Sequence, residues 1–111
     1  MSIDPSAPPS GTGCLECEKD GGWWFHLRRC GECGHVGCCD SSPSQHATAH
    51  WRETGHALMR SFEPGEDWWW DFDASASATG PELAEPQHRP LDQSAPGPVD
   101  RVPDNWQSLL H

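Results

Sequence analysis

The chain has 111 residues, which is room for one domain, and only 34% of them are hydrophobic. Its formal charge of −10 comes from 17 acidic against 7 basic residues, and this balance argues against nucleic acid or an anionic membrane as a partner. No stretch approaches the roughly 18 to 20 apolar residues of a membrane span, and the N-terminus lacks a secretion signal, so we expect a cytoplasmic protein. An apolar core built from this composition would be only marginally stable, so the fold needs an additional stabilising interaction such as bound metal or disulfide bonds.

Composition divides the chain into four segments. Residues 1–13 are rich in Pro, Ser and Gly and are expected to be a flexible lead. Residues 14–73 hold all six Cys, six of the seven Trp and all three Phe, and form the predicted domain. Residues 74–103 have almost no bulky apolar side chain and are predicted to be a disordered linker. In residues 104–111 the spacing of Trp106, Leu109 and Leu110 predicts a short amphipathic turn that either docks on the domain or recognises a partner.

The predicted domain is an α+β fold, in which a small zinc-stabilised antiparallel sheet packs on one main helix between disordered tails. Strands are expected at residues 23–28 and 35–38. The helix is predicted to start from Ser42 as its N-cap, with Pro43 at the first helical position, and to end at Thr54 before Gly55. Two further strands, at residues 57–62 and 67–72, are joined by a Glu-Pro-Gly-Glu turn.

Eight cysteine and histidine side chains have the types and spacing of metal ligands. They are Cys14, Cys17, Cys30, Cys33, Cys38, His46, His50 and His56. Eight ligands make two four-coordinate sites, and thiolate with imidazole favours zinc, although ligand type alone leaves iron–sulfur chemistry open. His46 and His50 lie one helical turn apart and either share one ion or straddle two. Spacing alone therefore leaves sequential and interleaved pairing both open.

Six cysteines are also compatible with a disulfide framework or a redox Cys-x2-Cys motif. A framework is disfavoured because no secretion signal is present, the spacing is short for a structural bridge, and the histidines would be unexplained. The redox motif is disfavoured because neither pair has a recognisable strand-to-helix context. Cys39 is interpreted as a spare thiol, and His26 and His35 as residues that pack around the sites.

Residues 14–17, 30–38, 46–50 and 53–56 together resemble the UBP-type zinc finger, a module of ubiquitin-specific proteases, a histone deacetylase and some ubiquitin ligases. The resemblance spans residues 14–72 and implies an interleaved arrangement of two structural Zn²⁺ ions. One ion would be held by Cys14, Cys17, Cys38 and His46. The other would be held by Cys30, Cys33, His50 and His56.

The sequence predicts no enzymatic activity. With all eight ligands used, neither zinc keeps an open position for water. His46 and His50 have the spacing of a metalloprotease helix, but Ala47 stands where that motif requires a glutamate base.

Tryptophans point instead to a binding function. Alternation along a strand sends Trp68 and Trp70 to one face and Trp69 to the other, so at least one indole should line a pocket. The candidate peptide-binding residues are Trp24, Arg28, Asp40, Trp69 and Trp70.

In the UBP family the pocket receives the C-terminal Gly-Gly of ubiquitin, and an Arg two residues after a zinc-ligand Cys pairs with the terminal carboxylate. Asp40 occupies that position here and would repel a carboxylate, while Arg28 or Arg29 is the candidate substitute for the anion clamp. The predicted function is a protein-interaction module that takes a peptide end or an extended segment, with a ligand other than ubiquitin and a preference for cationic groups. The alternatives are a zinc- and thiol-based redox regulator, and a structural appendage docked through its C-terminal turn.

Overall fold

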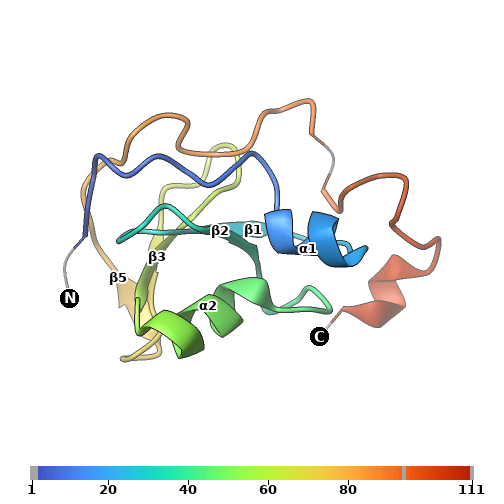
Figure 1. Cartoon of the computed structure of the whole chain (residues 1–111), viewed down its shortest axis with the longest axis horizontal. Coiled ribbons are helices and arrows are strands. Elements are labelled where there is room, and N and C mark those ends of the chain that lie inside the picture. Colours follow the sequence, from blue (N-terminus) through green and yellow to red (C-terminus); the bar gives the residue numbers. More distant parts are fainter. Residues whose placement is uncertain (1–2, 94, 111) are drawn as a thin grey trace.

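A five-stranded antiparallel sheet and one main helix form the centre of the molecule, as the sequence predicts (Figure 1). The computed structural model describes residues 3–93 and 95–110, so residues 1–2, 94 and 111 of the predicted lead, linker and tail lie outside this description. The elements are α1 (Leu15–Asp20), β1 (Leu27–Cys30), β2 (Val36–Cys38), α2 (His46–Thr54), β3 (Leu58–Ser61), β4 (Trp69–Asp71), β5 (Ala76–Ala78) and the 3-10 helix η1 (Trp106–Leu109). The strand order is β2-β1-β3-β4-β5. Among the described residues no helix is long and apolar enough to cross a bilayer.

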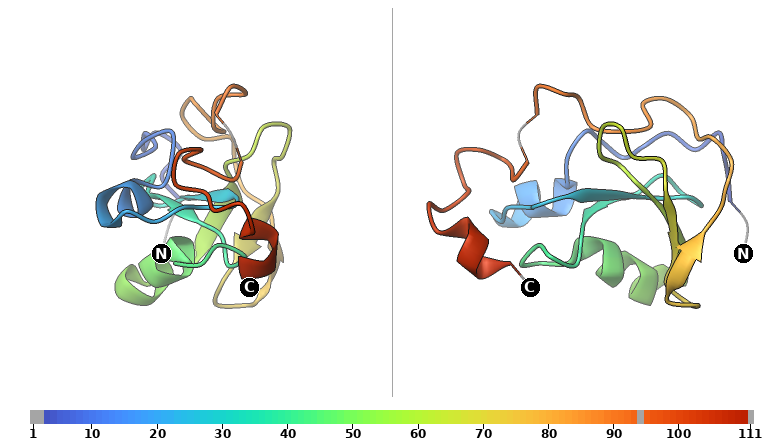
Figure 2. Two further views of the ribbon diagram at one scale, coloured as in Figure 1. Left: turned by 90° about the vertical axis from the view of Figure 1, so that its right-hand side faces the viewer. Right: turned by 180° about the vertical axis from the view of Figure 1, so that it is seen from behind.

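The sheet is covered by α2 on one face and by two irregular segments on the other (Figures 1 and 2). Gly37 in β2 lets α2 come close, because a Cβ at this position would lie 2.8 Å from the backbone nitrogen of Ala47. On the opposite face the N-terminal segment follows the sheet, and the Ser10 amide donates to the carbonyl of Gly34 at 2.9 Å. The Ala84 amide donates to the carbonyl of Pro5 at 2.7 Å, so the two covering segments also contact each other.

The main helix starts later than the sequence predicts. It begins at His46, and the preceding Gln45 takes a left-handed conformation with φ of 52°. Ser42 is not its N-cap, because the Ser42 hydroxyl instead accepts the Phe25 amide at 2.8 Å. The predicted C-terminus is correct: Gly55 is left-handed with φ of 78°, and its amide donates to the carbonyl of Trp51 at 2.8 Å.

Two arginines are buried under the irregular segments. Arg29 in β1 pairs in register with Arg60 in β3, and their exposed fractions are 0% and 7%. The Arg29 guanidinium donates to the carbonyls of Pro86 at 2.5 Å and Ala7 at 2.8 Å. Arg60 donates to the carbonyl of Gln87 at 2.7 Å. Backbone carbonyls from both covering segments therefore satisfy cations that would otherwise be costly to bury.

The segment predicted to be a disordered linker, residues 74–103, contacts the sheet and its loops at several described residues. It supplies β5, the buried Leu83, and Arg89, whose guanidinium pairs with the carboxylate of Glu63 at 3.0 Å. These contacts are mainly polar. The segment has few apolar side chains, but its backbone carbonyls accept hydrogen bonds from the two buried arginines.

The C-terminal residues also dock on the domain. Gly97 exchanges backbone hydrogen bonds with Trp24 at 2.7 and 2.9 Å. In η1, the Trp106 ring lies 5.5 Å from the ring of Phe25. Asn105 is the residue at the N-cap of η1. The amphipathic turn thus contacts the domain through the rings of Trp106 and Phe25.

Arg29→Ala is expected to lower the free energy of unfolding by about 2 to 4 kcal/mol, because it removes buried hydrogen bonds and leaves a cavity under residues 84–89. Chemical denaturation followed by tryptophan fluorescence measures this loss. The control is Arg52→Ala on the exposed side of α2, for which we expect a change within about 0.5 kcal/mol. Equal losses in the two variants would contradict the structural role of Arg29.

Candidate metal centres and the adjoining pocket

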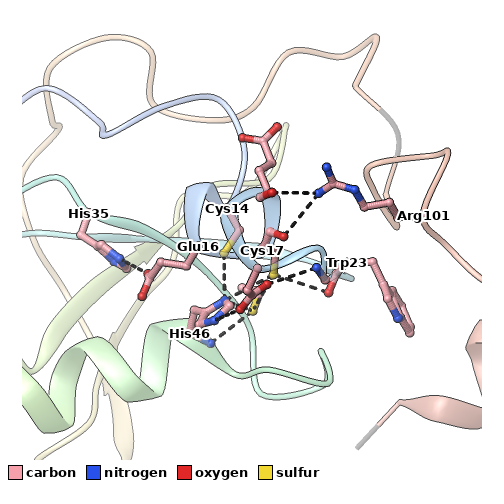
Figure 3. Close-up of polar contacts among 11 residues, drawn as sticks. Cys14, Glu16, Cys17, Trp23, His35, His46 and Arg101 are labelled. Carbon is pink, nitrogen blue, oxygen red and sulfur yellow. Dashed lines mark hydrogen bonds and ion pairs between the residues drawn. The ribbon is translucent and has the colours of Figure 1, made fainter.

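The first cluster joins α1, the end of β2 and the start of α2. It consists of Cys14, Cys17, Cys38 and His46, whose ligand atoms all lie within 4.8 Å of one another. Nδ1 of His46 lies 3.2 Å, 3.3 Å and 3.5 Å from the sulfurs of Cys14, Cys17 and Cys38. Figure 3 shows His46 turned toward the sulfurs of Cys14 and Cys17. The three cysteines are fully buried, so their sulfurs are shielded from competing ligands in solvent.

The second cluster joins the end of β1 to α2 and the residues after it. It consists of Cys30, Cys33, His50 and His56, again with all ligand atoms within 4.8 Å of one another. Nε2 of His50 lies 3.3 Å from the Cys33 sulfur, and Nδ1 of His56 lies 3.6 Å from the Cys30 sulfur. Burial, with smaller contributions from His35 and His56, lowers the pKa of His50 to about 4. Its imidazole is therefore neutral near pH 7, as metal ligation requires.

The spacing of these atoms fits tetrahedral zinc. Zinc–sulfur and zinc–nitrogen bonds of ordinary length place two sulfurs about 3.8 Å apart and a sulfur and a nitrogen about 3.6 Å apart. The sulfurs of Cys17 and Cys38 are 3.7 Å apart, and the sulfur–nitrogen distances of both clusters run from 3.2 to 3.6 Å. The prediction of two zinc ions in an interleaved arrangement is confirmed. Each set supplies four protein ligands, which closes the coordination shell and makes both sites structural.

Contacts outside the ligands connect the two clusters. Glu16, which lies between Cys14 and Cys17 in the chain, contacts Nε2 of His35 through its carboxylate (Figure 3). The His35 ring stacks on that of His50, with centroids 4.0 Å apart and planes inclined by 2°. A side chain beside the first cluster thus fixes the ring that orients a ligand of the second.

A cavity of about 220 Å³ opens on the α2 side of the sheet. Its lining comprises His26, Arg28, Cys39, Asp40, Ser41, Ala47, Met59, Trp68, Trp70 and Phe72. Zinc ligands border this pocket: Cys38 directly precedes Cys39, and His46 directly precedes Ala47. Metal coordination therefore holds the wall of the pocket that the sheet does not supply.

Three of the five predicted peptide-binding residues, Arg28, Asp40 and Trp70, line the pocket. Trp24 and Trp69 are not among the lining residues, and both are buried, with exposed fractions of 2% and 3%. Trp24 belongs to the core cluster with Cys14 and Cys17. Trp69 points to the opposite face of the sheet, where its ring packs against Gly31 and Gly80.

Sequence reasoning missed Trp68 and Phe72 as pocket residues. Strand alternation already places Trp68 and Phe72 on the face of Trp70, so this signal was available in the sequence. Arg29, the other candidate clamp, lies on the opposite face, and its Nη1 and Nη2 atoms donate to the carbonyls of Pro86 and Ala7.

His35→Ala is expected to weaken zinc binding at the second cluster by about tenfold or more, because the His50 ring loses the partner that orients it. Competition with a chromogenic chelator measures the release of each zinc equivalent. His88→Ala, an exposed histidine far along the chain from either cluster, is the control. Identical release curves for the two variants would show that the stacked ring does not act on the metal.

Comparison with known proteins agrees with this arrangement. The sequence model of the family described as "Zn-finger in ubiquitin-hydrolases and other protein" matches residues 14–83. The solution NMR structure of protein RPA1320 from Rhodopseudomonas palustris is similar to the chain, with 37% identity and a TM-score of 0.64, over 86% of this chain and 97% of that one. None of the curated proteins compared with the chain matches it. With its two interleaved Cys/His clusters and a family match over more than half of its length, the chain belongs to the UBP-type zinc-finger family.

Proposed function

We propose that this zinc finger is a protein-interaction module that takes the end of a peptide chain, or an extended segment, into the pocket between the sheet and α2. The observation that carries the proposal is the pair of indoles at the pocket, Trp68 and Trp70, of which Trp68 is 41% exposed. Large aromatic side chains left accessible beside a cavity are typical of protein-binding sites. The same family contains zinc fingers of ubiquitin hydrolases, which supports a protein as the partner.

Arg28 is the anion-binding group of the pocket in this proposal. Its guanidinium carbon lies 4.6 Å from the centre of the Trp68 ring, and Nη1 donates to the carbonyl of Leu27 at 2.9 Å. These two contacts hold the side chain at the pocket. A planar guanidinium with free N–H groups is well suited to a carboxylate.

Asp40 lowers the affinity of the module for ubiquitin in this proposal. Its side chain lines the same pocket, so the free carboxylate of a Gly-Gly tail would meet a negative charge. The redox alternative gains no comparable support, because Cys39 is buried and its sulfur contacts the hydroxyl of Ser42 at 3.6 Å.

Asp40→Arg is expected to raise the affinity for ubiquitin by about tenfold or more, because it replaces a repulsive charge with an attractive one. Titration of the zinc-loaded chain with ubiquitin, followed by isothermal calorimetry, measures this change. Asp92→Arg, the same change at an exposed position outside the pocket, is the control. Micromolar binding of ubiquitin by the unmodified chain would contradict the role given to Asp40.

Trp70→Ala is expected to weaken the binding of peptides selected from a library with free C-termini by about tenfold or more. The measurement is peptide titration with nuclear magnetic resonance detection of the indole N–H signals. Leu91→Ala is the control, because that side chain is 84% exposed and is not among the residues that line the pocket. Equal losses of binding in the two variants would overturn the pocket as the peptide site.

A further inference from the structure

The pocket contains two opposite charges that do not pair with each other. Arg28 and Asp40 line one cavity of about 220 Å³, yet among the described residues no ion pair joins them. Arg28 is held by the face of Trp68 and by the carbonyl of Leu27. Asp40 is held by the Thr48 hydroxyl, which donates to its Oδ1, and by the Gln45 side-chain amide, which donates to its backbone carbonyl at 2.9 Å.

Each charge keeps unused hydrogen-bonding capacity. Within the described part of the chain, Oδ2 of Asp40 accepts no hydrogen bond, and Nε and Nη2 of Arg28 donate none. His26 adds no positive charge near pH 7, because burial lowers its pKa. The pocket is therefore a pre-formed pair of separated charges with aromatic walls, and its complement must carry both signs.

We infer that the pocket selects a protein segment whose C-terminal residue is lysine or arginine, an inference that rests on the proposed function. The basic side chain lies against Trp70 with its charge at Asp40, and the α-carboxylate binds the free N–H groups of Arg28. A basic C-terminal residue carries both groups within one residue. The cavity volume is below the roughly 300 Å³ at which pockets for drug-sized ligands begin, which suits one large residue.

The charge of the whole chain favours the same ligand. The formal charge is −10, so a partner with a basic end approaches under attraction, whereas an acidic tail is repelled at long range. Added salt is therefore expected to lower the association rate and to weaken the ionic contacts in the pocket.

The test uses the zinc-loaded full chain and three Ala-Gly-Ala-Gly-X peptides, in which X is lysine with a free carboxylate, norleucine with a free carboxylate, or lysine with an amidated end. We expect the lysine acid to bind about tenfold more tightly than either of the others. Asp40→Asn should remove the preference for lysine over norleucine while keeping the hydrogen bond from Thr48. Arg28→Gln should remove the preference for the free acid over the amide. Asp92→Asn, an exposed change of the same charge, should leave both preferences intact.

The indole N–H signals of Trp68 and Trp70 separate the possible failures. If all three peptides shift these signals with equal dissociation constants, the charge selectivity is overturned while the pocket remains a peptide site. If no peptide shifts them, and ubiquitin does not either, the proposed function itself is overturned. Loss of the lysine preference in Asp92→Asn would also overturn the inference, because the effect would then come from overall charge.

Discussion

Zinc coordination is the interaction on which the rest of this structure depends. The eight ligands come from α1, from the ends of β1 and β2, and from α2 with the residues that follow it, so two ions fasten the helices to the sheet. A structural site of this kind contributes on the order of 10 kcal/mol, which exceeds the net stability that so small a core supplies. The apolar cluster itself contains Cys14, Cys17 and Cys38. Core packing and metal binding are thus one event, and both depend on the same residues.

The features that depend on short distances along the chain were predictable from the sequence. Six of the eight ligands follow from two Cys-x2-Cys pairs and a helical His pair, and Cys38 and His56 complete the set. The helix end follows from the glycine at position 55. Pairing of the ligands required the family resemblance, because His46 and His50 face one side of α2 but bind different ions. The contacts of Pro86 and Gln87 were not predictable from composition, since these residues act through backbone carbonyls that accept hydrogen bonds from Arg29 and Arg60.

Side-chain alternation along the strands explains which of the predicted binding residues line the pocket and which do not. Arg28 and Arg29 are adjacent in β1, so the pleat sends one to the pocket and the other to the covering segments. The same rule applies to Trp68, Trp69 and Trp70, yet sequence reasoning placed the buried Trp69 at the site and left out Trp68. Hydrophobic content alone does not say which face of a strand is covered. In this chain both faces are partly covered, one by a helix and the other by irregular chain.

The folded unit extends beyond the part of the chain that defines the family. The family match ends at residue 83, but Arg101 donates to the carbonyls of Cys17 at 3.4 Å and Glu18 at 3.2 Å, beside the first zinc cluster. The Trp106 ring lies against Phe25, and the Phe25 ring stacks on His26 with centroids 3.9 Å apart. Because His26 lines the pocket, the C-terminal segment supports one pocket wall from behind. Zinc ligands position two other lining residues, because Cys38 precedes Cys39 and His46 precedes Ala47, so the geometry of the pocket depends on both the metal and the C-terminal segment.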